Sequence, residues 1–375
     1  MKKIIGSLVF SVLAISALSA QAQIPGFSNT VHASFGQSYT KKKPKVEFFG
    51  FTDYFTGNVT VGKLVFAGDI AWQLIPTSRG INTRFIDPNL NVVITPIKNL
   101  DIGLGTNLDW TVGPGPSSGP AWSAYNMPYY GGLNLKNAPE KVSSDRDYPT
   151  GGFKVINYYA QKAFAVRYKY KNILEAGVSL PSLKDTDNFN AGLGIKANVK
   201  DKFTIGFAYN GPFNAGENYL YLGTHISAVK NFIIDAYWNM LTDSGTTRHD
   251  GANTVGGAIA FTVRKFYIKP EFAVTLWSDT DWAPAFYAAV NSHIYFSKEI
   301  RGGLKASWGL GSDLVKNDPD NKITAGARLD LNPHIVWFID KKNVFSAGVH
   351  IIPMWWRDGT NTFAWEIPVA WKFLF

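Results

Sequence analysis

Cysteine is absent from the 375-residue sequence, so no disulfide can stabilise the fold. Charge is also scarce, because Asp, Glu, Lys and Arg together make up only 17% of the residues. Hydrophobic residues reach 46%, yet mean hydropathy is −0.06, so they are dispersed among polar ones. Beyond the N-terminal segment, no run approaches the roughly 20 apolar residues that a membrane-spanning helix requires. These scarcities exclude a disulfide scaffold and a bundle of transmembrane helices.

The N-terminal segment is the one place where apolar residues are concentrated. Lys2 and Lys3 precede an apolar stretch over residues 4–18, and an Ala-Gln-Ala cleavage site ends at Ala22. This order is typical of a secretory signal peptide. We therefore expect residues 1–22 to be removed and the mature chain to be exported; an uncleaved anchor helix is the alternative.

The net charge of +9 does not indicate a nucleic-acid partner. Basic residues are scattered along the chain, apart from a cluster at residues 41–45. Nucleic-acid binding requires a basic patch or a recognisable module, and the sequence shows neither. No nucleic-acid partner is therefore expected.

Apolar residues recur at every second position through most of the chain. In residues 188–199, for example, Phe189, Leu193 and Ile195 share one parity, while Gly, Asn and Lys occupy the other. This period of two predicts β-strands, and no helix is expected after the signal peptide. A recurring Lys-Asn signal, as at Lys98-Asn99, predicts short turns that alternate with longer polar connections.

The pattern predicts an even number of strands between about 14 and 18, with about 18 as the best count. The expected strands are residues 29–40, 46–61, 63–76, 88–97, 100–112, 155–170, 172–183, 188–199, 202–210, 219–229, 232–241, 253–264, 266–278, 283–297, 300–313, 322–338, 344–357 and 362–375. They form one domain over residues 23–375, interrupted by a long aperiodic loop at 113–152.

A soluble β-sandwich and a membrane barrel both alternate, and two features favour the barrel. The less apolar face carries mostly Gly, Ala, Ser, Asn and Thr rather than the long charged side chains of a water-facing surface. The apolar face is rich in aromatic residues near strand ends, as Trp110, Trp308 and Trp337 illustrate. Because hydrocarbon offers no hydrogen-bond partner to backbone N–H and C=O groups, spanning strands must pair with one another in a closed ring. We therefore expect an all-β fold, a closed antiparallel transmembrane β-barrel.

The C-terminal segment FAWEIPVAWKFLF alternates bulky apolar residues with others and ends on Phe375. It resembles the C-terminal β-signal of bacterial outer-membrane barrels. The resemblance implies an outer-membrane location in a Gram-negative-type bacterium and recognition by the barrel-insertion machinery. Phe375, Phe373 and Trp371 match the signal, whereas Pro368 departs from it because it removes one donor from the hydrogen-bond ladder.

The barrel with one long loop resembles general or substrate-selective porins. In porins, one long loop folds into the lumen and narrows it, so residues 113–152 are the candidate constriction loop. Its acidic residues Glu140, Asp145 and Asp147 would form one side of the constriction. The alternative is an extracellular loop that lies outside the pore.

Strand parity predicts basic residues on the opposite wall of the lumen. A basic row that faces acidic loop residues would create a transverse field favouring dipolar or anionic solutes. Inward acids also exist, and the alternative is that these charges pair with one another. Inward tyrosines and histidines, among them Tyr267, His293 and His334, are interpreted as wall residues. The predicted pore-lining basic residues are Arg264, Lys269, Arg301, Lys305 and Arg328.

Catalytic and metal-binding patterns are weak. Ser244, His249 and Asp250 lie close in sequence, but real triads are assembled by geometry rather than by proximity along the chain. No spaced metal-ligand motif occurs, and no cofactor or enzymatic activity is expected. The predicted function is passive diffusion of small hydrophilic solutes through a porin-like channel. Its predicted partners are outer-membrane lipid, the transported solutes and further copies of the chain in a homo-oligomer. The alternatives are an adhesin-like surface-interaction barrel with a closed lumen and a barrel hydrolase.

Overall fold

The structure of the chain is a computed structural model. It describes residues 27–37, 46–77, 80–105, 164–171, 173–180, 190–200, 202–212, 218–242, 252–277, 285–311, 326–355 and 361–375. The candidate constriction loop at 113–152, with Glu140, Asp145 and Asp147, lies outside these residues. So does the predicted signal peptide.

Nineteen β-strands are assigned within the described residues. In chain order they are β1 (Ser28–Gln37), β2 (Val46–Val61), β3 (Leu64–Thr77), β4 (Gly80–Ile97), β5 (Leu100–Gly105), β6 (Phe164–Tyr170), β7 (Leu174–Leu180), β8 (Asn190–Val199), β9 (Phe203–Pro212), β10 (Asn218–Val229), β11 (Phe232–Thr242), β12 (Ala252–Val263), β13 (Phe266–Trp277), β14 (Ala285–Tyr295), β15 (Ile300–Gly311), β16 (Gly326–Phe338), β17 (Asn343–Gly348), β18 (His350–Trp355) and β19 (Asn361–Leu374).

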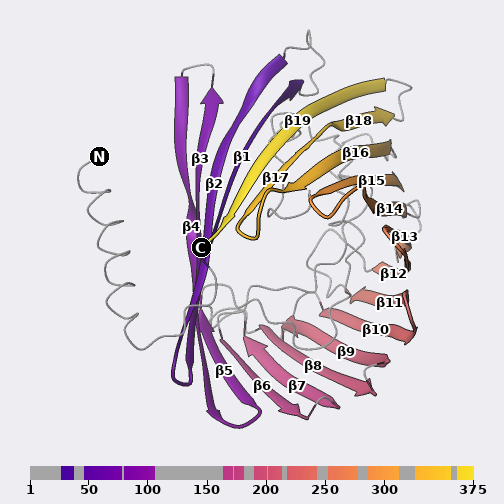
Figure 1. The fold of residues 1–375 in the computed structure, drawn as a ribbon. Helices are drawn as coiled ribbons and strands as arrows, with labels where there is room; N and C mark the ends of the chain where they lie inside the picture. The colour runs from indigo at the N-terminus through magenta and orange to yellow at the C-terminus, as the bar shows by residue number, and fades with distance from the viewer. Residues whose placement is uncertain are drawn as a thin grey trace, which may run out of the picture.

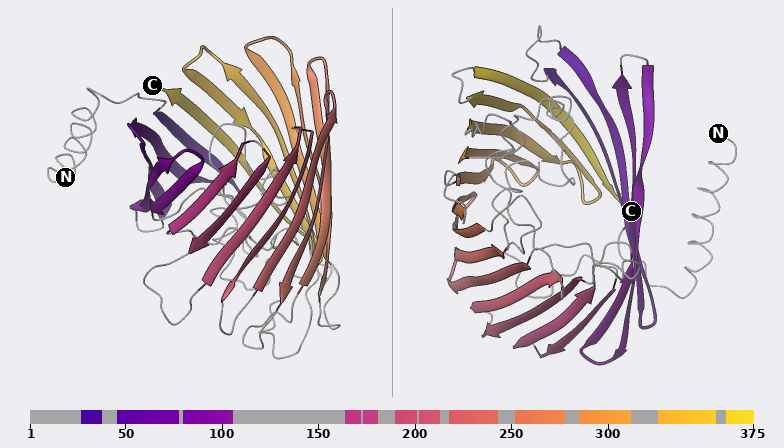
Figure 2. Two further views of the ribbon diagram at one scale, coloured as in Figure 1. Left: turned by 90° about the horizontal axis from the view of Figure 1, so that it is seen from below. Right: turned by 180° about the vertical axis from the view of Figure 1, so that it is seen from behind.

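The strands form one closed antiparallel ring. Each strand pairs with its neighbours in the chain, except that β17 and β18 each pair with β16 and β19, and β19 pairs with β1 to close the barrel. In Figure 1, β5 to β9 lie at the bottom of the ring, β10 to β16 on the right and β1 to β4 on the left. Figure 2 shows the strands running side by side at an oblique tilt. The closed transmembrane-type barrel predicted from the sequence is confirmed as the fold.

No helix in the described ranges has the length and apolar content needed to cross a membrane.

Nineteen assigned elements make an eighteen-strand barrel because β17 and β18 form one strand with a break at Val349. Both halves pair with β16 and β19 in an unchanged register. That register places Gly348 opposite Pro368 of β19, and Val349 donates its N–H to the carbonyl of Pro333 in β16 at 3.0 Å. Proline has no N–H, so Pro333 cannot donate to the carbonyl of Val349, and Pro368 cannot donate to the carbonyl of Gly348. The two prolines therefore account for the break, and the best strand count from the sequence is confirmed.

Side chains alternate between an exposed apolar outer face and a polar inner face. In β8, Leu193 and Ile195 are 42% and 46% exposed, whereas Gly192 and Gly194 are buried. In β19, Phe363 and Trp371 are exposed, while Glu366 is buried on the inner face. This parity is that of a barrel with lipid outside, because a soluble core would bury the apolar face instead.

The short turns that the structure describes gather at one end of the barrel. Ser28 at the start of β1 pairs with Leu374 at the end of β19, and the backbone N–H of Phe375 donates to the carbonyl of Phe27 at 2.8 Å. This end also holds the tight turns, where Asn99 adopts a left-handed conformation with φ of 74°. In the turns after β4 and β10 the Asn of the Lys-Asn signal adopts positive φ, as Asn tolerates, whereas in the turns after β6 and β8 Lys171 and Lys200 do so.

Expected and observed strands agree in order and differ at some ends. β4 begins at Gly80, whereas the sequence pattern predicted a start at residue 88. Pairing with β3 explains the extension, because Thr77 is already opposite Gly80. The predicted strand over residues 344–357 corresponds to β17 and β18 together.

Replacing Phe272 by Arg tests the assignment of the outer face. Phe272 lies near the middle of β13 with 58% of its surface exposed. We expect F272R to lower the free energy of unfolding in lipid vesicles by about 2–4 kcal/mol, because a guanidinium near the bilayer midplane is costly. Denaturant titration with tryptophan fluorescence measures the change, and Phe272→Leu is the control. Equal stability of F272R and wild type would contradict the assignment.

Candidate functional site on the inner wall

A row of polar residues crosses the inner face of four adjacent strands. The register pairs Lys269 of β13 with Asn291 of β14, Asn291 with Lys305 of β15, and Lys305 with Asn332 of β16. Paired residues in antiparallel strands share a face, so the two ammonium groups alternate with two amides. Lys269 and Lys305 are 8% and 6% exposed. Two cations are thus held within the wall instead of extending into solvent.

A second row, two positions along the same strands, is aromatic and imidazole-rich. Tyr267 pairs with His293, His293 with Gly303, and Gly303 with His334. The Tyr267 and His293 rings stack with centroids 4.7 Å apart and an interplanar angle of 21°. A Cβ at Gly303 would collide with the His334 imidazole, so this glycine leaves room for the ring. The row therefore presents flat π-surfaces beside the lysine row.

Arg301 extends the cationic region toward the short-turn end of β15. Its guanidinium lies 5.7 Å from the Tyr295 ring centroid and 5.6 Å from that of Phe338. Such contacts stabilise a cation because the ring face is electron-rich. Arg301 and Lys305 share the inner face of β15, and like charges at this spacing repel across a partly dry wall. Together they give the inner face of β15 two cations.

Acidic residues accompany these cations on neighbouring strands. The Lys269 ammonium lies 3.5 Å from a carboxylate oxygen of Glu271. Asp235 of β11 lies in the same cross-strand row as Glu271, and its Oδ1 is 2.6 Å from His225 Nδ1. The alternative interpretation, in which inward charges pair with one another, therefore holds for Lys269. Within the part of the chain that the structure describes, Lys305 forms no ion pair with a carboxylate, so it is the stronger candidate for attracting an anion.

The opposite arc of the wall carries compact ion pairs. Asp101 of β5 accepts hydrogen bonds from Arg167 Nη2 at 2.9 Å and from Thr95 Oγ1 at 2.9 Å, and Lys169 Nζ lies 3.3 Å away. On the next strands, Lys196 Nζ lies 3.3 Å from Glu175. These pairs join adjacent strands and balance most of the local charge. The two arcs therefore differ, because Arg167 and Lys196 have carboxylate partners on adjacent strands, whereas Lys305 forms no ion pair with any described residue.

The structure brings together three of the predicted basic residues. Lys269, Arg301 and Lys305 lie on the inner face of β13 and β15. Arg264 lies instead in the exposed turn after β12, with φ of 54°, apart from the wall. The backbone of Arg328 pairs with Gly309, and its side chain lies outside the described part.

Sequence parity placed the tyrosines and histidines on the wall but did not group them with Arg301 and Lys305. Only the cross-strand register does so. The turn at Arg264-Lys265 aligns β12 with β13, and the connection over residues 296–299 aligns β14 with β15. Counting pairs outward from residues 296–299 could have predicted that Lys305 lies opposite Asn291, whereas no short turn joins β13 to β14.

Among the described residues, no group of three or more His, Asp or Glu side chains could hold a metal ion. The inner wall instead offers ammonium, guanidinium, amide and aromatic groups side by side. Such a surface can replace part of the hydration shell of an organic anion while ring faces contact its apolar part.

Comparisons with known proteins identify the fold. No protein-family model and no curated protein sequence matches the chain. The structure of OccAB3 from Acinetobacter baumannii is similar at a TM-score of 0.58 and 10% identity, covering 95% of this chain and 99% of that one. The outer membrane protein OpdK from Pseudomonas aeruginosa is similar at a TM-score of 0.55 and 9% identity, covering 94% and 99%. OpdK solved with vanillate matches at 0.54 and 10%, covering 93% and 99%. The chain therefore has the fold of an outer-membrane β-barrel.

The contact between Asp101 and Arg167 yields a stability prediction. Asp101→Asn replaces a charged acceptor by an amide that turns a donor toward two cations. We expect a loss of about 1.5–3 kcal/mol in the free energy of unfolding, the range for hydrogen bonds to charged groups. Denaturant titration of D101N, Arg167→Met and the double variant measures the coupling. Strictly additive effects would contradict a direct interaction.

Proposed function

We propose that the chain is an outer-membrane channel for passive diffusion of small hydrophilic solutes, with a preference for anionic ones. The observation that carries the proposal is the inner wall of β13 to β16. There Lys305 and Arg301 lie beside the stacked rings of Tyr267 and His293. A solute with a carboxylate and a flat apolar body would find complementary groups in one place.

The fold supports the proposal. Chains with the same barrel are membrane proteins, and OpdK, which is among them, has been solved with vanillate, a small organic anion. An apolar outer face and a charged inner face are the combination that a water-filled pore in a bilayer requires. This wall chemistry suits binding and release rather than reaction, which supports a non-enzymatic role.

A closed-lumen barrel for surface interactions is the second candidate. The burial of Lys269, Arg301 and Lys305, each below a tenth exposed, favours it, because an open pore leaves its wall hydrated. The two candidates differ in one measurable property. Purified barrel in a planar bilayer should give discrete conductance steps if it is a channel, and none if the lumen is closed.

Charge substitutions at Lys305 test the anion preference. One charge acting through water at about 7 Å is worth about 0.6 kcal/mol, or about threefold in local ion concentration. We expect Lys305→Gln to lower the chloride-to-potassium permeability ratio about ninefold, because local chloride falls and local potassium rises about threefold each, and Lys305→Glu to lower it further. Reversal potentials under a KCl gradient measure this ratio.

Lys305→Arg is the matched control, because it keeps the charge and should keep the selectivity. Channel activity with equal permeability ratios in all four proteins would refute the role of Lys305 while leaving the channel itself intact. Absence of conductance in the wild type would refute the channel.

The C-terminal strand supports a role in assembly. Phe375 contributes one backbone hydrogen bond to closure, and the rings of Trp371 and Phe373 stack at 5.2 Å on the outer face of β19. We propose that Phe375, Phe373 and Trp371 form the signal read by the insertion machinery. Aromatic side chains displayed along the closing strand are accessible from the lipid side before the barrel closes.

Deleting Phe375 tests this assembly role. Loss of one backbone hydrogen bond costs only about 0.5–1.5 kcal/mol, so the refolded protein should remain stable. We expect a severalfold lower yield of folded barrel in cell envelopes, measured by heat-dependent migration on gels. Phe375→Tyr keeps an aromatic end and should restore the yield. A normal yield without Phe375 would contradict the role of this residue.

A further inference from the structure

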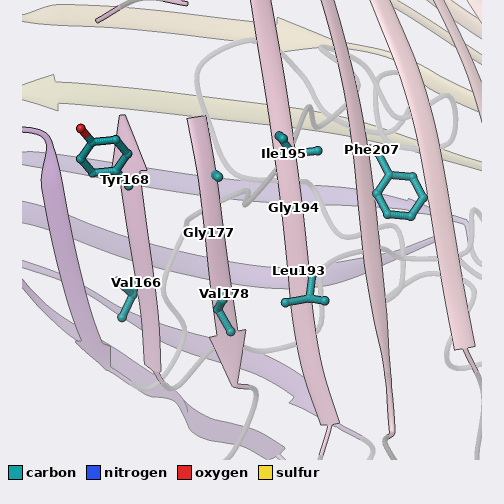
Figure 3. A pocket seen from close by; sticks show the side chains of 9 residues that line it. Val166, Tyr168, Gly177, Val178, Leu193, Gly194, Ile195 and Phe207 are labelled. Carbon is teal, nitrogen blue, oxygen red and sulfur yellow. The ribbon is translucent and has the colours of Figure 1, made fainter. Parts of the chain in front are cut away.

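The outer face of β6 to β9 carries a shallow apolar groove, shown in Figure 3. In the register, Tyr168 pairs with Ala176, Ala176 with Ile195, and Ile195 with Phe207. Ala176 is the only small side chain in this row, so it leaves a depression between larger neighbours. The groove has a volume of about 410 Å³, within the range of roughly 300–1,000 Å³ that holds small molecules.

A second apolar row lengthens the groove toward the bilayer centre. Val166 pairs with Val178, and Val178 pairs with Leu193. Val178 and Leu193 are exposed on the outer face, as are Tyr168, Ile195 and Phe207 of the first row. The groove therefore opens toward lipid, and a chain of methylene groups could lie along it.

The nearby short-turn end of the barrel carries exposed cations all around. Each of the eight short turns in the described part has at least one exposed Lys: Lys63, Lys98, Lys171, Lys200 with Lys202, Lys230, Lys265, Lys298, and Lys341 with Lys342. Two acidic residues accept hydrogen bonds within their own turns. Ser297 Oγ donates to Glu299 at 2.8 Å, and the N–H of Lys342 donates to Asp340 at 2.6 Å. That bond, with others from Asn343, holds the pKa of Asp340 below its ordinary value.

Three of these lysines, Lys171, Lys200 and Lys202, lie at the end of the groove. The turns after β6 and β8 are adjacent, because the N–H of Asn198 donates to the carbonyl of Ile173 at 2.7 Å. Lys171 Nζ lies 5.4 Å from the ring centroid of Tyr170, an outward residue that is 46% exposed. The ring therefore holds this ammonium on the lipid side of the barrel instead of the lumen side.

The separation between cations and groove matches one leaflet of a bilayer. Tyr168 precedes Lys171 by three residues and Ile195 precedes Lys200 by five, or about 10 and 17 Å along the strands. Strands in such barrels tilt by about 35–45° and cross an apolar band about 25 Å tall. Because the strands are tilted, these distances along the strands correspond to smaller depths in the bilayer, and the groove lies within one half of the apolar band. A lipid headgroup at the lysines would therefore place an acyl chain in the groove.

We propose that one anionic phospholipid binds here, with its phosphate at Lys171, Lys200 and Lys202 and an acyl chain over Ala176. The inference rests on the proposed membrane location and is independent of conductance. Short turns of such barrels face the periplasm, so the lipid belongs to the inner leaflet of the outer membrane.

The observations favour a lipid over two other occupants. An acidic protein could bind the exposed lysines of the short turns, but it would not reach an apolar groove that lies within the hydrocarbon. A second copy of the chain could cover the groove, but it would bring its own lysines against these lysines. An amphiphile with an anionic head satisfies both features at once.

Native mass spectrometry of the full-length barrel, released from vesicles of equal phosphatidylglycerol and phosphatidylethanolamine, tests the proposal. We expect wild type to retain one phosphatidylglycerol per barrel. The variant K171Q/K200Q/K202Q should reduce the retained phosphatidylglycerol-to-phosphatidylethanolamine ratio at least fivefold, since each lysine near an anionic surface contributes about that factor. Ala176→Phe, which fills the depression, should reduce retention of both lipids while all lysines remain.

The matched control is K265Q/K298Q/K341Q, which removes three exposed lysines from the turns after β12, β14 and β16, away from the groove, and should leave retention unchanged. If the control lost as much phosphatidylglycerol as the K171Q/K200Q/K202Q variant, retention would depend on the lysines of all short turns together, and the proposal of one site would be overturned. So would retention of neither lipid by wild type, unchanged retention in A176F, or a lipid-free dimer that A176F dissociates. Heat-dependent migration on gels verifies that each variant is folded. Conductance of the same proteins tests the channel separately, so either conclusion can fail alone.

Discussion

Backbone hydrogen bonding within hydrocarbon is the constraint on which the whole structure depends. A strand that crosses the apolar band cannot leave N–H or C=O groups without partners, so each strand needs a neighbour on both sides. The pairing of β1 with β19 meets this demand for the first and last strands. Once the ring is closed, side-chain parity follows, because successive residues must face either lipid or lumen. The outer aromatics and the inner ion pairs are thus both consequences of closure.

Much of the fold could be predicted because the period of two is a local property. Leu193 and Ile195 of β8 alternate with glycines, and their outward orientation follows without knowledge of any partner strand. The short turns were also predictable, since residues such as Asn99 tolerate positive φ. The early start of β4 was not, because its first residues are ordered by pairing with β3.

The inner wall was predictable only as a list of inward residues. Grouping them requires the cross-strand register, which depends on turn geometry several residues away. That register places Tyr267 and His293 beside the lysine row, and it separates Arg264 from the wall. It also decides which cations have a carboxylate on the next strand, since Asp101 of β5 forms ion pairs with Arg167 and Lys169 of β6. Charge count alone would have treated all of these residues alike.

Pro333 and Pro368 have a consequence for how the last strands find their alignment. A slip of β19 by two residues would keep every side chain on its proper face, so hydrophobic patterning discriminates poorly against it. In the native alignment, the two missing donors fall on the successive carbonyls of Gly348 and Val349, within a single interruption. A slip would divide that interruption into two separate defects. The two prolines thereby favour one register of β19 when the barrel closes, because any other register would interrupt the backbone hydrogen bonds at two places.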